Sequence, residues 1–70
     1  MKTKEAKIFG DNAKRVRMAK GLTQEAVAKS VGVRVNRIGI LERAKTDPLL
    51  SSMELLARGL KTPLHELLKP

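Results

Sequence analysis

The sequence contains no cysteine and only one aromatic residue, Phe9, among its 70 residues. Without cysteine, neither disulfides nor thiolate metal sites can reinforce the small core that a chain of this length buries. The near absence of aromatics disfavours RNA and single-stranded DNA as ligands, because proteins usually stack such bases on aromatic side chains. No apolar run approaches the roughly 20 residues that span a bilayer, and none follows the basic N-terminus as in a secretory signal. We therefore expect one small domain without a membrane span or leader.

The sequence also lacks the residues that an active site requires. His65 is the only histidine, and no cluster of carboxylates accompanies it, so we expect no metal site and no cofactor. The chain has no nucleophile–base set and is too short to enclose a deep substrate pocket. These absences favour a protein that is not an enzyme and that binds no small-molecule ligand.

Positive charge is what the sequence has in excess, with a formal net charge of +8. Residues 1–45 hold twelve lysines and arginines against four acids, whereas the charges of residues 46–70 cancel. Concentrated positive charge attracts polyanions, and the scarcity of aromatics then favours duplex DNA. A membrane surface is disfavoured, because the basic residues flank a packed-core pattern and not an open amphipathic face. The alternative is that the lysines only keep a small domain soluble.

Helical spacing of apolar residues recurs in five segments, while the strand signal is weak. We therefore expect a compact all-α domain of five helices. The first helix is expected from Lys4 or Ile8 to Lys20, the second from the Thr23 cap to Gly32, and the third over residues 35–44. The fourth is expected to begin at a Ser51 or Ser52 cap. The fifth is expected to begin at a Thr62 cap, with Pro63 in its first turn. The expected inward residues are Phe9, Ala13, Val16, Ala19, Val27, Ala28, Val31, Ile38, Leu41, Met53, Leu56, Ala57, Leu60, Leu64, Leu67 and Leu68.

The most specific pattern is a spacing of four residues between Gln24, Ala28 and Gly32. Ala28 is small where a second helix would cross closely above it. Gly32 supplies a positive φ, which a residue with a Cβ adopts only at a cost. Ile38 and Leu41, three residues apart, would hold the second helix on the core. This geometry is that of a helix-turn-helix.

Three segments of the chain, KGLTQEAVAKSVGV, ILER and MELLARGLKTPLHELL, resemble the phage-repressor/Cro class of helix-turn-helix domains, the XRE-like family. The resemblance covers residues 9–68. It implies a lambda-repressor-like DNA-binding domain at residues 8–70, after a basic arm at residues 1–7 that either reaches along DNA or is frayed. It also implies a cytoplasmic, bacterial or phage-encoded transcriptional regulator of the repressor/Cro type.

Such a regulator acts by occupying double-stranded operator DNA, generally as a homodimer on a palindromic site. We expect a dimer here because one recognition helix covers too few base pairs for specificity. Leu49, Leu55 and the last helix are the expected interface. The alternative is an antitoxin-like or other protein-interaction module on the same fold, with Ile40, Leu49 and Leu55 facing the partner.

In the family's docking mode, the third helix enters the major groove and the second crosses the backbone. On a helical wheel Asn36 and Ile40 lie opposite Ile38, so they would face the bases. Asparagine can pair with adenine, arginine with guanine, and an apolar side chain can pack on a thymine methyl. The expected base contacts are Arg34, Val35, Asn36, Arg37 and Ile40.

Contacts to the DNA backbone are expected where the second helix begins, because a helix N-terminus suits a phosphate. The alternative for this position is that Thr23 only caps the helix and Gln24 is only solvated. Arg17 and Glu42 match a family pair that forms an ion bridge, although Arg17 could instead lean toward phosphate. The expected backbone contacts are Thr23, Gln24, Arg43, Lys45 and Thr46.

Four residues depart from the family pattern. Gly39 and Ile40 replace residues that are usually polar. The glycine could let the helix sit deep in the groove, both could serve a protein contact, or they could mark the loss of sequence-specific DNA recognition. Ala44 replaces the glycine that usually ends the third helix. Asp47 stands where a basic residue is common, and we expect it to repel phosphate.

Overall fold

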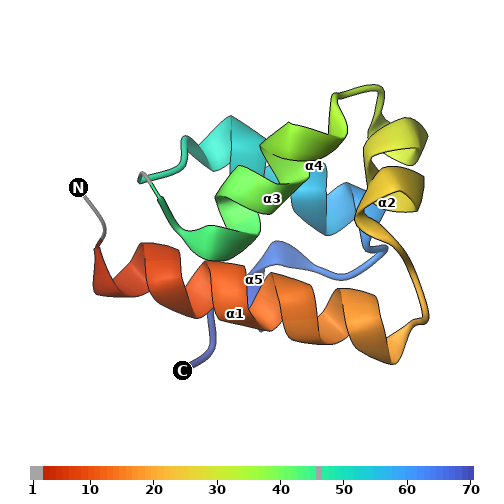
Figure 1. The fold of residues 1–70 in the computed structure, drawn as a ribbon. Helices are drawn as coiled ribbons and strands as arrows, with labels where there is room; N and C mark the ends of the chain where they lie inside the picture. Colours follow the sequence, from red (N-terminus) through yellow and green to blue (C-terminus); the bar gives the residue numbers. More distant parts are fainter. Residues whose placement is uncertain (1–2, 46) are drawn as a thin grey trace.

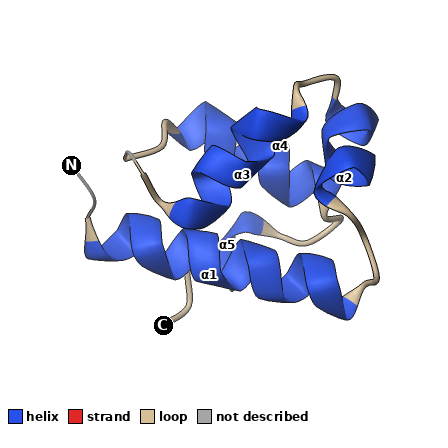
Figure 2. Cartoon of the chain, viewed as in Figure 1, coloured by secondary structure: helices blue, strands red, loops and turns tan. Residues whose placement is uncertain are grey.

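The computed structural model describes residues 3–45 and 47–70, and this part of the chain forms five helices without a strand. The all-α, five-helix prediction is confirmed. Figure 1 shows α1 lying along one side of the molecule, with α2 and α3 crossing above it and α4 behind them, and Figure 2 shows the short loops between helices. None of the described helices is long and apolar enough to cross a membrane. The helices are α1 (Lys4–Ala19), α2 (Gln24–Val31), α3 (Val35–Arg43), α4 (Leu50–Gly59) and α5 (Leu64–Leu67).

The first two helices begin at threonine caps. The Oγ1 atoms of Thr3 and Thr23 accept hydrogen bonds from the amides three residues later, each at 3.0 Å, which satisfies one of the free donors at a helix start. The predicted Thr23 cap is therefore confirmed. α1 begins at Lys4, the earlier of the two expected starts, so residues 4–7 are helical here.

Four helices end in the same way, with one residue in the left-handed region followed by a 6→1 hydrogen bond, the Schellman motif. Gly32, at φ 74°, ends α2 as predicted. The left-handed residues of α1, α2, α3 and α4 are Gly21, Gly32, Ala44 and Lys61, and the bonds run from Leu22 N to Arg17 O, Val33 N to Ala28 O, Lys45 N to Ile40 O and Thr62 N to Ala57 O.

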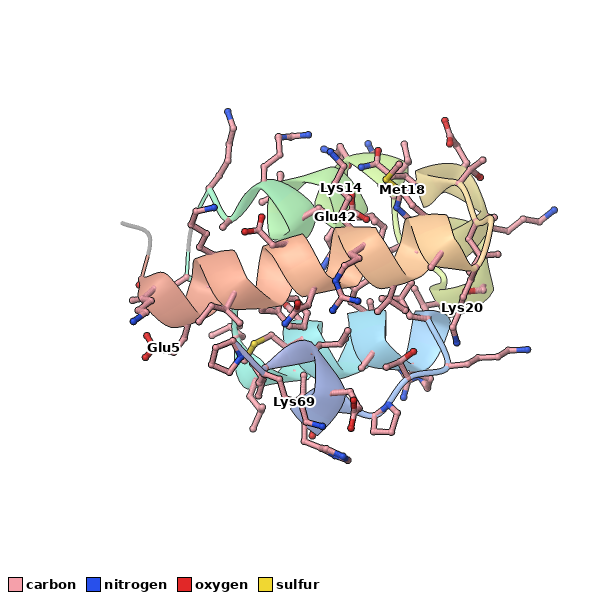
Figure 3. The ribbon with its side chains drawn as sticks, turned by 90° about the horizontal axis from the view of Figure 1, so that it is seen from below. Glu5, Lys14, Met18, Lys20, Glu42 and Lys69 are labelled. Carbon is pink, nitrogen blue, oxygen red and sulfur yellow. The ribbon has the colours of Figure 1, made fainter. Side chains whose placement is uncertain are left out.

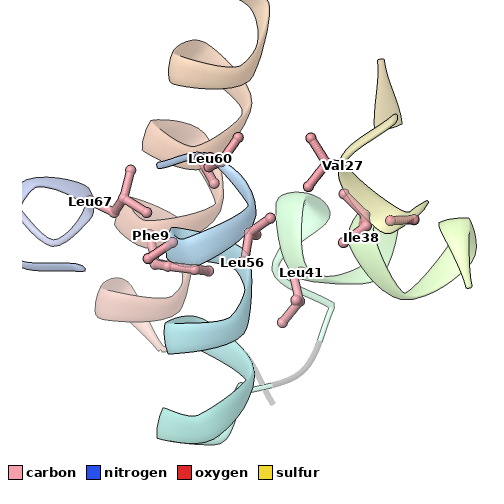
Figure 4. Packing of buried hydrophobic residues seen from close by; sticks show 10 residues of the cluster. Phe9, Val27, Ile38, Leu41, Leu56, Leu60 and Leu67 are labelled. Carbon is pink, nitrogen blue, oxygen red and sulfur yellow. The ribbon is translucent and has the colours of Figure 1, made fainter. Parts of the chain in front are cut away.

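The core is formed by side chains from all five helices, as Figure 4 shows. Two expected inward residues are exposed: Ala19, and Leu68 at 40%. Ala19 lies about 80° from Phe9 on the helical wheel, at the margin of the buried face. Leu68 follows the last residue of α5, where helical periodicity no longer orients it. The fully buried large side chains are Phe9, Val27, Ile38, Leu56, Leu60 and Leu67.

The predicted caps of the last two helices are wrong. α4 begins at Leu50 without a side-chain cap, and Ser52 is buried within it. Pro63 occupies the cap position of α5, while the Thr62 hydroxyl donates to the Leu60 carbonyl at 3.1 Å. Free carbonyls at the end of a helix also need hydrogen-bond partners. Here the Thr62 hydroxyl serves as such a partner and does not cap α5.

A close approach between α1 and α3 fixes the position of the third helix. A Cβ added to Gly10 would lie 2.6 Å from the Glu42 carbonyl oxygen and 2.8 Å from the Leu41 carbonyl oxygen. The backbones of the two helices can approach this closely only because residue 10 has no side chain. Gly10 therefore sets the distance between α1 and α3.

Candidate nucleic-acid interface

The third helix divides its residues cleanly between core and surface. Ile38 is fully buried, and Leu41 and Glu42 are 8% and 6% exposed. The apolar residues on the outer face, Val35 and Ile40, are 38% and 37% exposed. All five residues expected to contact bases are exposed, namely Arg34, Val35, Asn36, Arg37 and Ile40.

Most of these exposed residues meet at the turn between α2 and α3. Arg34, Asn36, Arg37 and Ile40 line an open hollow there, together with residues 32 and 33. The arrangement places hydrogen-bonding and apolar groups side by side at the beginning of α3. A base edge presents the same mixture of donors, acceptors and methyl groups.

Arg37 lies at the edge of this face that adjoins α4. Its Nη2 atom donates to the Ser52 Oγ at 2.8 Å, which explains why a buried serine occurs inside α4. An arginine has five N–H donors, so this one bond leaves the guanidinium further donors for a ligand. The sequence did not indicate the contact, because it joins residues that lie 15 positions apart on different helices.

Arg17 and Glu42 form a largely buried ion pair that connects α1 to α3. The Arg17 Nε and Nη2 atoms lie 2.6 and 3.2 Å from the two carboxylate oxygens, and Nη1 donates to the Leu22 carbonyl at 2.8 Å. The side chains of Arg17 and Glu42 are 11% and 3% exposed. Arg17 is thus engaged within the protein and does not lean outward.

Gln24, the first residue of α2, joins the same group. Its Nε2 atom donates to Glu42 Oε1 at 3.0 Å, so the side chain is held in place and is not merely solvated. Thr23 caps the helix and is exposed. Among the described residues, the amides of Gln24 and Glu25 have no acceptor, so the start of α2 presents two free N–H groups.

The loop after α3 contains one residue, Asp47, with a contact that the sequence did not indicate. Lys45 is exposed, and Thr46 lies outside the described residues. The Asp47 carboxylate accepts a hydrogen bond from the Thr3 amide at 2.8 Å. A carboxylate at a helix N-terminus also interacts favourably with the helix dipole, so Asp47 tethers the loop to the start of α1.

Gly39 is buried beneath the side chain of Arg43. A Cβ added to Gly39 would lie only 2.7 Å from Arg43 Nη1, which shows that the arginine folds back along its own helix. The space that the absent side chain leaves is filled by Arg43.

Comparison with known proteins gave consistent matches over most of the chain. A family described as helix-turn-helix matches residues 14–67. The transcriptional regulator YazB of Bacillus subtilis, an uncharacterised protein of the helix-turn-helix type, is 35% identical over 66 residues, which cover 94% of this chain and 96% of YazB.

Two solved structures share the fold. The hypothetical transcription factor NHTF from Neisseria has a TM-score of 0.85 and 27% identity, covering 94% of this chain and 76% of its own. The restriction-modification controller protein C.AhdI from Aeromonas hydrophila has a TM-score of 0.82 and 31% identity, covering 93% of this chain and 98% of its own. The arrangement of all five helices is therefore shared with these proteins.

Proposed function

This chain belongs to the helix-turn-helix family of transcriptional regulators, and from that premise we propose that it acts by binding one specific operator sequence in double-stranded DNA. The observation that carries the proposal is the division of α3 into a buried face and a continuous exposed face. A helix face that meets only water needs only polar residues, whereas the exposed face of α3 combines asparagine, arginine, valine and isoleucine. Regulation follows from occupancy, by which the bound protein blocks or recruits polymerase at a promoter.

In the proposed complex, α3 enters the major groove with its N-terminal end toward the bases. Asn36 pairs with adenine, and Arg34 and Arg37 pair with guanine or with a phosphate. Val35 and Ile40 cannot form such hydrogen bonds, so they pack on thymine methyl groups. The exposed apolar residues of α3 are accounted for in this way.

Backbone contacts come from the start of α2 and from the end of α3. The free amides at the start of α2, with Thr23 and the Gln24 side chain, face one phosphate. Arg43, Lys45 and Thr46 contact the backbone near the C-terminal end of α3, where Arg43 borders the same hollow as Gln24. These contacts set the register of the protein on the duplex but carry no sequence information themselves.

We propose that the operator is a palindrome bound by two copies of the chain. Leu49 and Leu50, before and at the start of α4, are 70% and 59% exposed, and Leu68 is 40% exposed. Pro48, Met53 and Leu68 line a mostly apolar hollow beside them. A second copy would cover this surface and place two α3 helices about 34 Å apart, one turn of the duplex.

Selection of binding sites from a random duplex pool, followed by titration of the Asn36→Ala variant, tests the proposal. We expect a palindromic site, and we expect the variant to lose about 1–3 kcal/mol of discrimination at one base pair of each half-site. Ser30→Ala is the matched control. It also truncates a polar side chain of the helix-turn-helix, but Ser30 lies near Gly59 of α4 and not on the exposed face of α3. Equal binding of every sequence by the unaltered protein would refute a specific operator.

The exposed leucines also favour a second candidate, an antitoxin-like module that binds a different protein through the same surface. The two candidates differ in what the purified chain does alone. Self-association together with sequence-selective DNA binding supports the regulator. A monomer whose affinity for DNA is unchanged by Asn36→Ala supports the protein-interaction module.

A further inference from the structure

A further hollow opens between α1 and α3, beside the start of α2. It is separate from the exposed face of α3 that would read bases. We call it the α1–α3 hollow. Its lining includes Lys7, Asp11, Lys14, Gln24, Glu42 and Arg43.

The charges that line the α1–α3 hollow do not cancel. Lys7 pairs with Asp11 at 3.0 Å, and Glu42 pairs with Arg17, which lies outside the lining. Within the described residues, neither Lys14 nor Arg43 forms an ion pair. Two unneutralised cations therefore border one hollow.

Lys14 lies on the side of α1 that faces α3. Figure 3 places it next to Glu42, with Met18 further along the same side, whereas Lys69 lies on the opposite side of α1. Arg43 reaches the hollow from α3, where its guanidinium rests over Gly39. One cation thus comes from each of the two helices that border the hollow.

Gln24 adds a neutral donor at a fixed position. Its Nε2 atom gives one hydrogen to Glu42, and a carboxamide nitrogen carries a second. The group that borders the hollow therefore offers two cations and one oriented N–H. A single phosphate, with its negative charge and acceptor oxygens, matches this set.

We propose that the α1–α3 hollow binds one phosphate of the duplex backbone, with Lys14 and Arg43 as its cations and Gln24 as its neutral donor. Gly39 is a positioning residue, because only a residue without a side chain leaves room for the Arg43 guanidinium at this position. The proposal rests on the proposed function and extends the DNA contacts to α1. The duplex backbone is the favoured source of the phosphate, because Gln24 and Arg43, two of the residues proposed to contact the backbone, line the hollow.

The salt dependence of duplex binding tests the role of Lys14. Each phosphate contact contributes about 0.9 to the slope of log K against log salt concentration, so we expect Lys14→Gln to reduce the slope by about 0.9 per bound protomer. Binding should weaken equally for operator and random duplexes, because a phosphate contact carries no sequence information. Lys69→Gln is the control, since it removes the same charge from the opposite side of α1 and should leave binding nearly unchanged.

The outcomes separate this proposal from the function on which it rests. If Lys14→Gln and Lys69→Gln behave alike while Asn36→Ala loses discrimination, the phosphate site is refuted and the operator-binding function stands. If the unaltered protein shows no duplex binding, the function itself fails. Tight binding of inorganic phosphate to the free protein, abolished by Lys14→Gln without a change in duplex affinity, would refute the duplex backbone as the source.

A double-mutant cycle tests the role of Gly39. We expect Gly39→Ala to lower the salt slope when Arg43 is present, because the new methyl group displaces the guanidinium. In an Arg43→Gln background the same substitution should have no further effect on the slope. A persistent effect in that background would show that Gly39 does not act through Arg43.

Discussion

At the scale of single residues, the buried Glu42 connects α3 to both preceding helices. Its carboxylate accepts hydrogen bonds from Arg17 on α1 and Gln24 on α2. A buried ion pair generally orients its partners more than it stabilises the fold. One acidic side chain therefore fixes the relative positions of the first three helices.

Removal of one member of this pair should nevertheless lower the free energy of unfolding. Glu42→Gln leaves the buried Arg17 guanidinium without a counter-ion, and breaking such a pair costs about 3–5 kcal/mol. We expect a loss near the lower figure, because Arg17 is still 11% exposed. Urea unfolding measures the change.

The control is Asp11→Asn, which breaks the ion pair between Lys7 and Asp11. Those side chains are 69% and 65% exposed, and exposed pairs contribute about 0–1 kcal/mol. A similar small loss for Glu42→Gln would show that Glu42 does not organise the three helices.

At the scale of the element, the helix ends differ in how well their residues suit the left-handed conformation. Two of the four Schellman motifs use glycine, whereas Ala44 and Lys61 adopt φ of 53° with a side chain present. A residue with a Cβ loses about 1–2 kcal/mol in this conformation. Glycine at the same position avoids this strain. The gain in stability is partly offset, because glycine also raises the conformational entropy of the unfolded chain.

The two strained helix ends should respond differently to glycine. Lys61→Gly should stabilise the fold by about 0.5–1 kcal/mol, because Lys61 is exposed and its side chain contributes little packing. Ala44 is only 5% exposed, so Ala44→Gly also loses about 0.8 kcal/mol of methyl burial. We expect a change close to zero for Ala44→Gly. Thermal unfolding of both variants checks the difference, and equal effects would contradict it.

The contact between α1 and α3 gives another prediction at this scale. Gly10→Ala gains about 1 kcal/mol of helix propensity, but its methyl group would overlap two backbone carbonyl oxygens of α3. Overpacking typically costs about 1–3 kcal/mol. Backbone atoms cannot rotate away, so we expect a cost at the upper end of that range and a net loss of up to about 2 kcal/mol.

Gly39→Ala is the matched comparison for Gly10→Ala, because its methyl group meets only the flexible end of Arg43. That variant should gain up to about 1 kcal/mol of stability. Urea unfolding compares the two, and a stabilised Gly10→Ala variant would contradict the close approach of α1 and α3.

The sequence predicted the features that depend on local periodicity and turn chemistry. Spacing of 3.6 residues placed Ile38 inward and Asn36 outward, and the need for a positive φ identified Gly32. It could not predict contacts between distant segments, such as Arg37 with Ser52 or Gly10 with the end of α3. A helical wheel gives the direction of the Cα–Cβ bond, but not how a long side chain such as Arg43 bends.

At the scale of the whole molecule, the apolar surface near the start of α4 is formed by residues other than those that line the hollow at the start of α3. Leu49 and Leu50 are the most exposed leucines of the molecule's described part. An exposed cluster of large apolar side chains commonly marks an interface. If a second copy covers it, self-association and operator affinity should depend on the same residues.

Leu50→Glu should therefore separate dimerisation from folding. Glutamate is favourable in the first turn of a helix, so the fold should be retained. We expect sedimentation to show a monomer, and affinity for the palindrome to fall while affinity for one half-site is unchanged. A dimer of unaltered stability would place the interface elsewhere.

The separation of buried and exposed residues along α3 has a consequence for how such a protein can diversify. Core residues hold the helix in place, and none of Arg34, Val35, Asn36, Arg37 and Ile40 belongs to that core. Substitutions at these five positions leave the hydrophobic interior intact, although a change at Arg37 also removes its bond to Ser52. A descendant of this chain could therefore acquire a new target site by exchanging a handful of surface residues, while its scaffold is inherited unchanged.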